Sequence, residues 1–195
     1  KKIKFIGNLK FAEDQNQNLD NLNKKLKNEF NKKKVWIASS THKDEEIFCA
    51  KAHIKLKTKV KNLMTVIIPR HIHRVEEIIE KIKELNLKVA CHSSLPKNLN
   101  DIDIYIVDTF GETKKFHKLA SSVFLGGSII NRGGQNPLEA ARFGSKIFHG
   151  PYISNFKDVY KLLKSLNISK KIKTPNKLAT SIIFKKNKYT ETRIK

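Results

Sequence analysis

The sequence predicts an α/β protein built on a mostly parallel, doubly wound sheet. Two observations carry this prediction. Short apolar runs such as Met64-Thr65-Val66-Ile67-Ile68 are hydrophobic at nearly every position, which is typical of strands buried on both faces. These runs alternate with segments such as residues 75–82, whose apolar residues recur at helical spacing. Such alternation indicates βα units, in which helices cover both faces of a parallel sheet.

The expected elements follow one another along the whole chain, with no repeat and no Pro/Gly/Ser-rich linker between them. A polar, Lys-rich helix comes first, the apolar runs mark the strands, and a terminal helix precedes a polar tail. The expected strands are residues 35–38, 64–68, 87–91, 104–107, 123–125 and 146–148. The expected helices are residues 19–31, 44–56, 75–82, 112–120, 136–143, 155–166 and 175–184.

Composition excludes several classes of protein. A chain of 195 residues is long enough to form a full hydrophobic core without disulfides or metal ions to stabilise it. Cys49 and Cys91 are too few for a disulfide framework and lack metal-ligand spacing, so a reducing compartment is expected. No apolar run approaches the ~18 residues that span a bilayer, and no signal-peptide pattern opens the chain. A secreted miniprotein, a zinc module and an integral membrane protein are thereby excluded.

The charge is strongly basic but evenly spread. The chain has 40 basic and 18 acidic residues, a net charge of +22, and only 5 of the 40 are arginine. Proteins that read nucleic acid usually cluster their charge and favour Arg. The composition therefore favours a solvated Lys surface, attracted to anionic membranes or nucleic acid at low salt. The single methionine is Met64, so we expect the sequence to be part of a longer protein.

Unusual residues collect directly after the expected strands, where ligands bind in parallel sheets. Ser40 and Thr41 fit either a helix cap completed by Glu45 or Glu46, or a ligand contact. Pro69 ends the second strand and places Arg70 at the sheet edge. There a guanidinium holds a phosphate or pairs with a neighbouring acid, and the scarcity of Arg favours the phosphate. His71 and His73 are typical of polar loop residues.

Two further loops carry candidate binding residues. Asp108 and Thr109 are cap candidates, Gly111 allows close backbone approach, and Phe110 offers a ring to a flat base. Residues 124–139 hold half of the eight glycines, and such turns present backbone N–H groups to an anion. In this segment Asn136 suits an N-cap and Pro137 the first helical position, while Glu139 either closes the cap or accepts from ribose hydroxyls. Neither GxxxxGK[ST] nor GxGxxG is present.

Taken in order, these segments resemble the 3-deoxy-D-manno-octulosonic acid (Kdo) transferases of lipid A assembly. The matching segments are Gly7-Asn8-Leu9-Lys10-Phe11, Ala38-Ser39-Ser40-Thr41-His42 with Glu45-Glu46, Pro69-Arg70-His71, Asp108-Thr109-Phe110-Gly111-Glu112, Gly126-Gly127-Ser128, Gly133-Gly134-Gln135-Asn136-Pro137-Leu138-Glu139 and His149-Gly150-Pro151. The chain departs from the family at Gln135, where His is common, at His73, which replaces an acid, and at Phe110, where Met is common. The first departure argues against proton transfer at that position.

The resemblance implies a GT-B glycosyltransferase, in which two Rossmann-like domains face each other across a cleft. Residues 1–195 would be the C-terminal domain that binds CMP-Kdo, and the N-terminal acceptor domain with its catalytic base is absent. The enzyme would transfer Kdo to a lipid A precursor with inversion and without a metal or cofactor. Lys10 would be the catalytic cation. The CMP contacts would be Pro69, Arg70, Phe110, Gly111, Glu112, Asn136, Pro137, Leu138 and Glu139.

The same resemblance implies a place and partners. The enzyme would act at the cytoplasmic face of the bacterial inner membrane, against an anionic lipid surface, and would bind no specific nucleic acid. Taken alone, the 195 residues would be inactive. Two alternatives stay open: another nucleotide-sugar enzyme of this fold, such as an epimerase that takes a uracil nucleotide, and a basic nucleic-acid-binding module.

Overall fold

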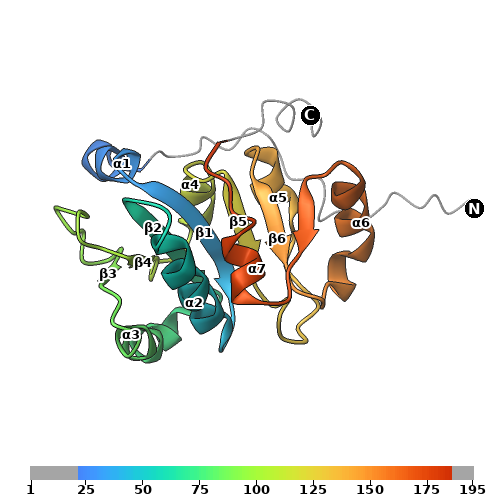
Figure 1. Ribbon diagram of the computed structural model, residues 1–195, viewed down its shortest axis with the longest axis horizontal. Coiled ribbons are helices and arrows are strands. Elements are labelled where there is room, and N and C mark those ends of the chain that lie inside the picture. The colour runs from blue at the N-terminus through green and yellow to red at the C-terminus, as the bar shows by residue number, and fades with distance from the viewer. Residues whose placement is uncertain (1–21, 186–195) are drawn as a thin grey trace, which may run out of the picture.

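The strands form where the sequence is apolar on both sides. In the computed structural model, which describes residues 22–185, seven strands make one sheet in which every neighbouring pair is parallel (Figure 1). They are β1 (Lys34–Thr41), β2 (Leu63–Pro69), β3 (Val89–Cys91), β4 (Ile104–Ile106), β5 (Ser122–Leu125), β6 (Lys146–His149) and β7 (Ser169–Lys171). All seven residues of β2 are buried, because helices cover both faces of the sheet.

Helices lie on both faces, so the protein has two apolar cores. One core contains residues of α1 (Lys24–Asn31), α4 (Thr113–His117), α5 (Leu138–Arg142) and α6 (Lys157–Ser165). The other contains residues of α2 (Glu45–Lys57), α3 (Val75–Lys83) and α7 (Pro175–Ala179). Short 3-10 turns, η2 (Ile72–Arg74) and η3 (Ser154–Phe156), lead into α3 and α6. The doubly wound α/β fold is confirmed.

Along a strand, successive side chains pack alternately into one core and the other. Val35 and Ile37 of β1 face the core that α1 helps to form, while Trp36 and Ala38 face the core that contains α2. This is the two-residue period of a strand with both faces buried. Within residues 22–185, no helix combines the length and the apolar character needed to cross a bilayer.

The structure differs from the sequence expectations at the ends of elements. The helices expected at 112–120, 136–143, 155–166 and 175–184 are shorter. Of the helix expected at 19–31, residues 19–21 lie outside the described residues, and α1 begins at Lys24 with Asn23 as its N-cap. One strand, β7, is missing from the expectation. It is a three-residue edge strand in which Ser169 is buried and both lysines are exposed, so it has no apolar run to reveal it.

The strand order determines where a ligand-binding crevice opens at the edge of the sheet. The order is β3-β4-β2-β1-β5-β6-β7, so the chain moves to one side of β1 with β2 and to the other side with β5. Helices that follow two such strands leave in opposite directions, and the loops after them open a crevice at the carboxyl edge of the sheet. The loops after β1 and β5 therefore line this crevice, and those after β2 and β4 lie beside it.

Candidate functional site

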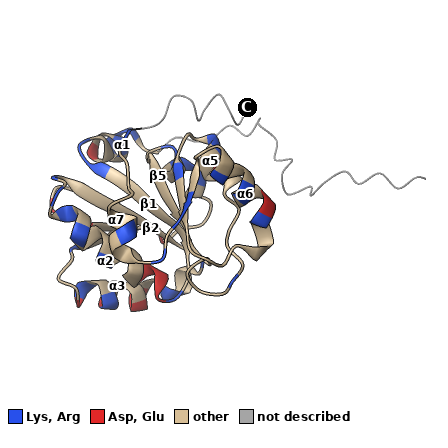
Figure 2. Cartoon of the chain, turned by 45° about the vertical axis from the view of Figure 1, so that its right-hand side comes forward, with Lys and Arg blue, Asp and Glu red and all other residues tan. Residues whose placement is uncertain are grey.

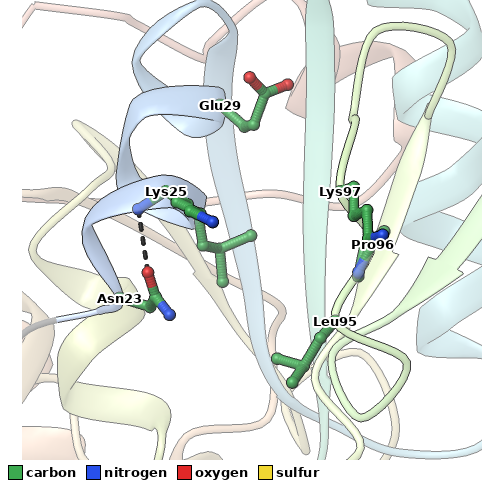
Figure 3. Close-up of a pocket in the computed structure, with 7 residues that line it drawn as sticks. Asn23, Lys25, Glu29, Leu95, Pro96 and Lys97 are labelled. Carbon is green, nitrogen blue, oxygen red and sulfur yellow. Dashed lines mark hydrogen bonds between the residues drawn. The ribbon is translucent and has the colours of Figure 1, made fainter.

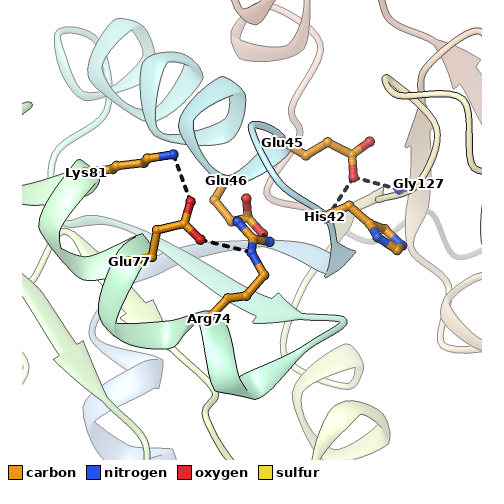
Figure 4. A network of polar contacts seen from close by, with 7 residues as sticks. All are labelled: His42, Glu45, Glu46, Arg74, Glu77, Lys81 and Gly127. Carbon is orange, nitrogen blue, oxygen red and sulfur yellow. Dashed lines mark hydrogen bonds and ion pairs between the residues drawn. The ribbon is translucent and has the colours of Figure 1, made fainter.

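The glycine-rich turn after β5 is occupied by a carboxylate of the protein itself. Glu45, the fully buried first residue of α2, accepts hydrogen bonds from the backbone N–H groups of Gly127 (2.6 Å), Ser128 (3.0 Å) and Ile129 (2.8 Å). It also accepts from the N–H of His42 at 3.0 Å (Figure 4). The glycine-rich turn thus presents N–H groups to an anion, as predicted, but this anion is the carboxylate of Glu45 and not a ligand.

This contact depends on close backbone approach. A Cβ on Gly126 would lie 2.3 Å from the carbonyl oxygen of Ser40 and 2.6 Å from the Cα of Thr41, so only glycine fits between β1 and β5 here. Of the two alternatives for Ser40 and Thr41, the helix cap is wrong, because neither residue is the N-cap of α2. The N-cap is Asp44, with φ of 73° and no side-chain cap, and Thr41 is a buried residue of β1. Glu45 joins the two loops instead of closing a capping box.

A second carboxylate, that of Glu139 in α5, contacts a residue of another helix. The side chain of Asn136 accepts from the N–H of Leu138 at 3.0 Å, and α5 begins at Leu138 with Pro137 as its N-cap, one position later than predicted. Glu139 does not return to this cap. Its Oε1 lies 3.2 Å from Nδ1 of His117 in α4, and a quarter of its side chain stays exposed (26%). The capping interpretation of Glu139 is therefore not supported, because the contact observed for its carboxyl group is with His117.

Arg70 and Arg74 lie only four positions apart in the sequence but have very different surroundings. Arg74 is mostly buried and binds Glu46 (3.1 Å) and Glu77 (3.2 Å), and Lys81 completes this network (Figure 4). Burial raises the pKa of the Glu46 carboxyl, and the guanidinium of Arg74 opposes that effect. Arg70 is exposed, and its guanidinium makes no hydrogen bond or ion pair with any residue from 22 to 185. Arg74 thus has a structural role, and Arg70 is open to a ligand.

The loop after β4 presents an aromatic ring. Phe110 is 78% exposed, and Gly111 beside it has φ of 81° with open space around it. Glu112 lies 3.0 Å from Nζ of Lys115 and 3.8 Å from Nε2 of His92, so it is held at the start of α4. Asp108 accepts from the N–H of Ser93 at 2.8 Å, so it joins two loops and does not cap α4. An exposed ring of this size at a sheet edge is available for stacking on a ligand.

Three histidines follow two neighbouring strands: His42 comes after β1, and His71 and His73 come after β2. The rings of His42 and His71 are 5.6 Å apart, as are those of His71 and His73. Burial lowers the pKa of His42, and Glu45 opposes this effect. Among the described residues, no group of three or more His, Cys, Asp or Glu side chains has the arrangement of a metal site.

Cavities also open away from the crevice. One of about 350 Å³ lies between α1 and the loop after β3, with Leu26, Leu95 and Pro96 among its lining residues (Figure 3). Another, of about 470 Å³, lies at the opposite edge of the sheet, where strands begin, and its lining includes four lysines. These are Lys33, Lys57, Lys61 and Lys88.

The structure brings most of the predicted site residues to one edge. Pro69 and Arg70 follow β2, Phe110 to Glu112 follow β4, and Asn136 to Glu139 precede and begin α5, all at the carboxyl side of the sheet. Lys10 lies outside the described residues. Sequence reasoning missed His117 and the true role of Glu45, because both depend on contacts between residues 22 to 84 positions apart.

Comparison with known proteins identifies relatives of this chain. No protein-family model matches the chain. The 3-deoxy-D-manno-octulosonic acid transferase of Rickettsia felis is 34% identical over 180 residues, which are 92% of this chain. The enzyme of the same name from Haemophilus influenzae is 28% identical over 166 residues. The chain belongs to the 3-deoxy-D-manno-octulosonic acid transferase family. It spans 38% of the length of both of these relatives.

Solved structures confirm the fold. The structure titled as the C-terminal CMP-Kdo binding domain of WaaA from Acinetobacter baumannii superposes with a TM-score of 0.72 and 24% identity. The match covers 77% of this chain and 79% of that domain. MnaA of S. aureus with UDP matches with a TM-score of 0.50 and 16% identity, over 46% of its length. The chain thus has the Rossmann-like fold of a family member's C-terminal domain.

Proposed function

We propose that this chain is the donor-binding domain of a Kdo transferase and binds CMP-Kdo in the crevice at the carboxyl edge of the sheet. The relatives are named for Kdo transfer, and the domain from Acinetobacter baumannii is titled for CMP-Kdo binding. A second domain, outside this chain, would complete a GT-B enzyme and carry the acceptor and the catalytic base. The chain's share of its relatives' length supports that division.

One observation carries the proposal: three loops present an unpaired guanidinium, an exposed aromatic ring and a half-buried carboxylate to the same edge. Arg70 would bind the phosphate, because a guanidinium matches phosphate oxygens bidentately. Phe110 would stack on the cytosine, and Glu139 would accept from the ribose hydroxyls. Pro69, Gly111, Glu112, Asn136, Pro137 and Leu138 would shape the walls of the nucleotide site.

The chemistry follows from the charge that develops. When the bond between Kdo and phosphate breaks, negative charge grows on CMP while the sugar becomes cationic. Fixed cations near the phosphate lower the barrier by stabilising that charge. Arg70 would serve the phosphate throughout, and Lys10 would act mainly in the transition state. With these cations in place we propose that transfer needs neither metal nor cofactor. Inversion of the sugar centre is proposed from the family resemblance alone.

The surface charge fits a membrane-associated enzyme. Lysines are spread over the helices on both faces of the sheet, with acidic residues between them (Figure 2). We propose that this surface is attracted to the anionic cytoplasmic face of the inner membrane, where a lipid A precursor would be the acceptor. The attraction is general, since the charge forms no arginine-rich stripe.

Nucleotide selectivity tests the proposal. The chain should bind CMP about tenfold more tightly than UMP, because the 4-amino group of cytosine and the 4-oxo group of uracil need opposite hydrogen-bond partners. Calorimetry at physiological salt on a folded sample measures both affinities. Tighter binding of UMP would favour the epimerase alternative. Binding of any duplex DNA with a steep salt dependence, and none of CMP, would favour the nucleic-acid module.

A further inference from the structure

Three polar side chains from separate elements form a continuous buried line next to the crevice. Oγ of Ser39 in β1 lies 3.0 Å from Nε2 of His117 in α4, and Nδ1 of the same ring lies 3.2 Å from Oε1 of Glu139 in α5. Ser39 is 1% exposed and His117 is 3% exposed. Nδ1 and Oε1 are both buried, neither makes a hydrogen bond to a described residue, and the polar contact of both atoms is this 3.2 Å ion-pair contact. Each atom is therefore the polar neighbour on which the other depends.

The order of atoms is that of a Ser-His-acid hydrolase, but the burial is not. A hydrolase serine must reach a substrate carbonyl with its Oγ. Ser39 lies inside the sheet, paired with Ile68 on one side and Leu125 on the other, and has almost no exposed surface. The partly open member is Glu139 at the other end of the line, with 26% of its side chain exposed. Of the three side chains, the carboxylate is therefore the one accessible to a ligand in the crevice.

A buried imidazole between a hydroxyl and a carboxylate has a defined proton arrangement. The carboxylate accepts only, so the proton of a neutral ring belongs on Nδ1, and Nε2 then accepts from the hydroxyl of Ser39. In this arrangement Ser39 holds the ring and the ring holds Oε1. The second carboxylate oxygen is left for a ligand in the crevice. In metal sites, likewise, a carboxylate that accepts from the second ring N–H of a histidine fixes the tautomer and orientation of the ring.

We propose that His117 is a positioning residue for Glu139, which it orients so that the second carboxylate oxygen meets the ribose of a bound nucleotide. The proposal rests on the proposed function. It gives a role to a histidine that lies in no segment of the family motif. It also explains why a polar ring is buried among apolar residues of α4 such as Phe116.

The charges around Glu139 predict how the line responds to pH. Burial is the largest effect and raises the pKa of the Glu139 carboxyl, but His117, Lys114 of α4 and Arg142 of α5 together outweigh it, so the net direction is downward. Removal of the His117 contact should let burial dominate and raise this pKa. As the pH is lowered, nucleotide binding should then begin to weaken at a higher pH than in the wild type, since a protonated carboxyl is a poorer acceptor.

Two amide variants separate the two ends of the ring. In His117→Asn the amide nitrogen takes the place of Nδ1, so the contact with Glu139 is kept and that with Ser39 is lost. In His117→Gln the amide takes the place of Nε2, so the contact with Ser39 is kept and that with Glu139 is lost. Calorimetry with CMP and carbon-13 titration of the Glu139 carboxyl are the two readouts, and denaturation in urea reports the stability of each variant.

We expect His117→Asn to bind CMP within about threefold of wild type and His117→Gln to bind about tenfold more weakly. Only His117→Gln should raise the pKa of Glu139, and it should cost no further affinity in a Glu139→Gln background. Equal affinities of the two amide variants, or an unchanged carboxyl titration in His117→Gln, would overturn the proposal. So would a wild-type nitrogen-15 spectrum showing a neutral ring with its proton on Nε2, whether or not any variant folds. If the wild type fails to bind CMP while the titrations behave as expected, it is the proposed function that fails.

Discussion

Replacement of Glu45 by glutamine should cost the protein about 3 kcal/mol or more of unfolding free energy. The carboxylate is fully buried and accepts four backbone N–H groups, from His42, Gly127, Ser128 and Ile129. Glutamine offers one oxygen and turns an NH₂ group toward donors. Each buried N–H left without an acceptor costs about 1–3 kcal/mol, so the loss of two sets the expected scale.

Urea denaturation at neutral pH measures this effect. Glu80→Gln is the matched control, because it makes the same chemical change at an exposed position of α3 and should alter stability by less than about 0.5 kcal/mol. If the two variants unfold at the same urea concentration, the N–H groups of the turn have other acceptors, and the account of the glycine-rich turn is wrong.

Loss of Arg70 or of Glu139 should each weaken CMP binding about tenfold to a hundredfold, for different reasons. Arg70→Ala removes a charged partner of the phosphate, so the affinity for CMP should fall. The affinity for cytidine, which has no phosphate, should change little. Glu139→Gln removes a charged acceptor of the ribose hydroxyls, so CMP and cytidine should suffer alike.

The comparison of the two ligands makes this prediction specific. Calorimetry of CMP and cytidine on each variant gives the four affinities. Arg74→Ala is not a suitable control, because that side chain holds the buried Glu46 and its loss would unsettle the fold. Equal losses of CMP and cytidine in Arg70→Ala would show that this residue supports the loop and does not bind phosphate.

The fold was accessible to sequence reasoning because strands with both faces buried are visible as apolar runs. The bounds expected for β2, β4, β5 and β6 fall within one residue of the observed strands, and the run at β1 lies inside a strand that continues three residues further, to Thr41. β7 was not predicted because only one of the three residues of this edge strand is buried. Local signals therefore sufficed wherever burial was continuous along the chain.

The site was accessible as a location but not as a set of contacts. Residues after strands must meet at one edge, so Arg70, Phe110 and Glu139 could be placed there without a structure. The partners of Glu45 and Glu139 could not be placed, because a capping residue and a long-range acceptor look alike in sequence. Three-dimensional packing alone brings Glu45 to Ile129 and His117 to Glu139.

The central claim is that CMP binds at the carboxyl edge of the sheet, and nitrogen-15 chemical-shift mapping of the chain with CMP tests it most directly. At physiological salt, we expect shifts at the amides of Arg70, of Phe110 to Glu112 and of Glu139, with smaller shifts from UMP at equal concentration. The lysine-lined cavity at the opposite edge, with Lys33, Lys61 and Lys88, serves as the internal reference and should not respond. Shifts centred on that cavity, or spread over lysines and abolished by salt, would contradict the account.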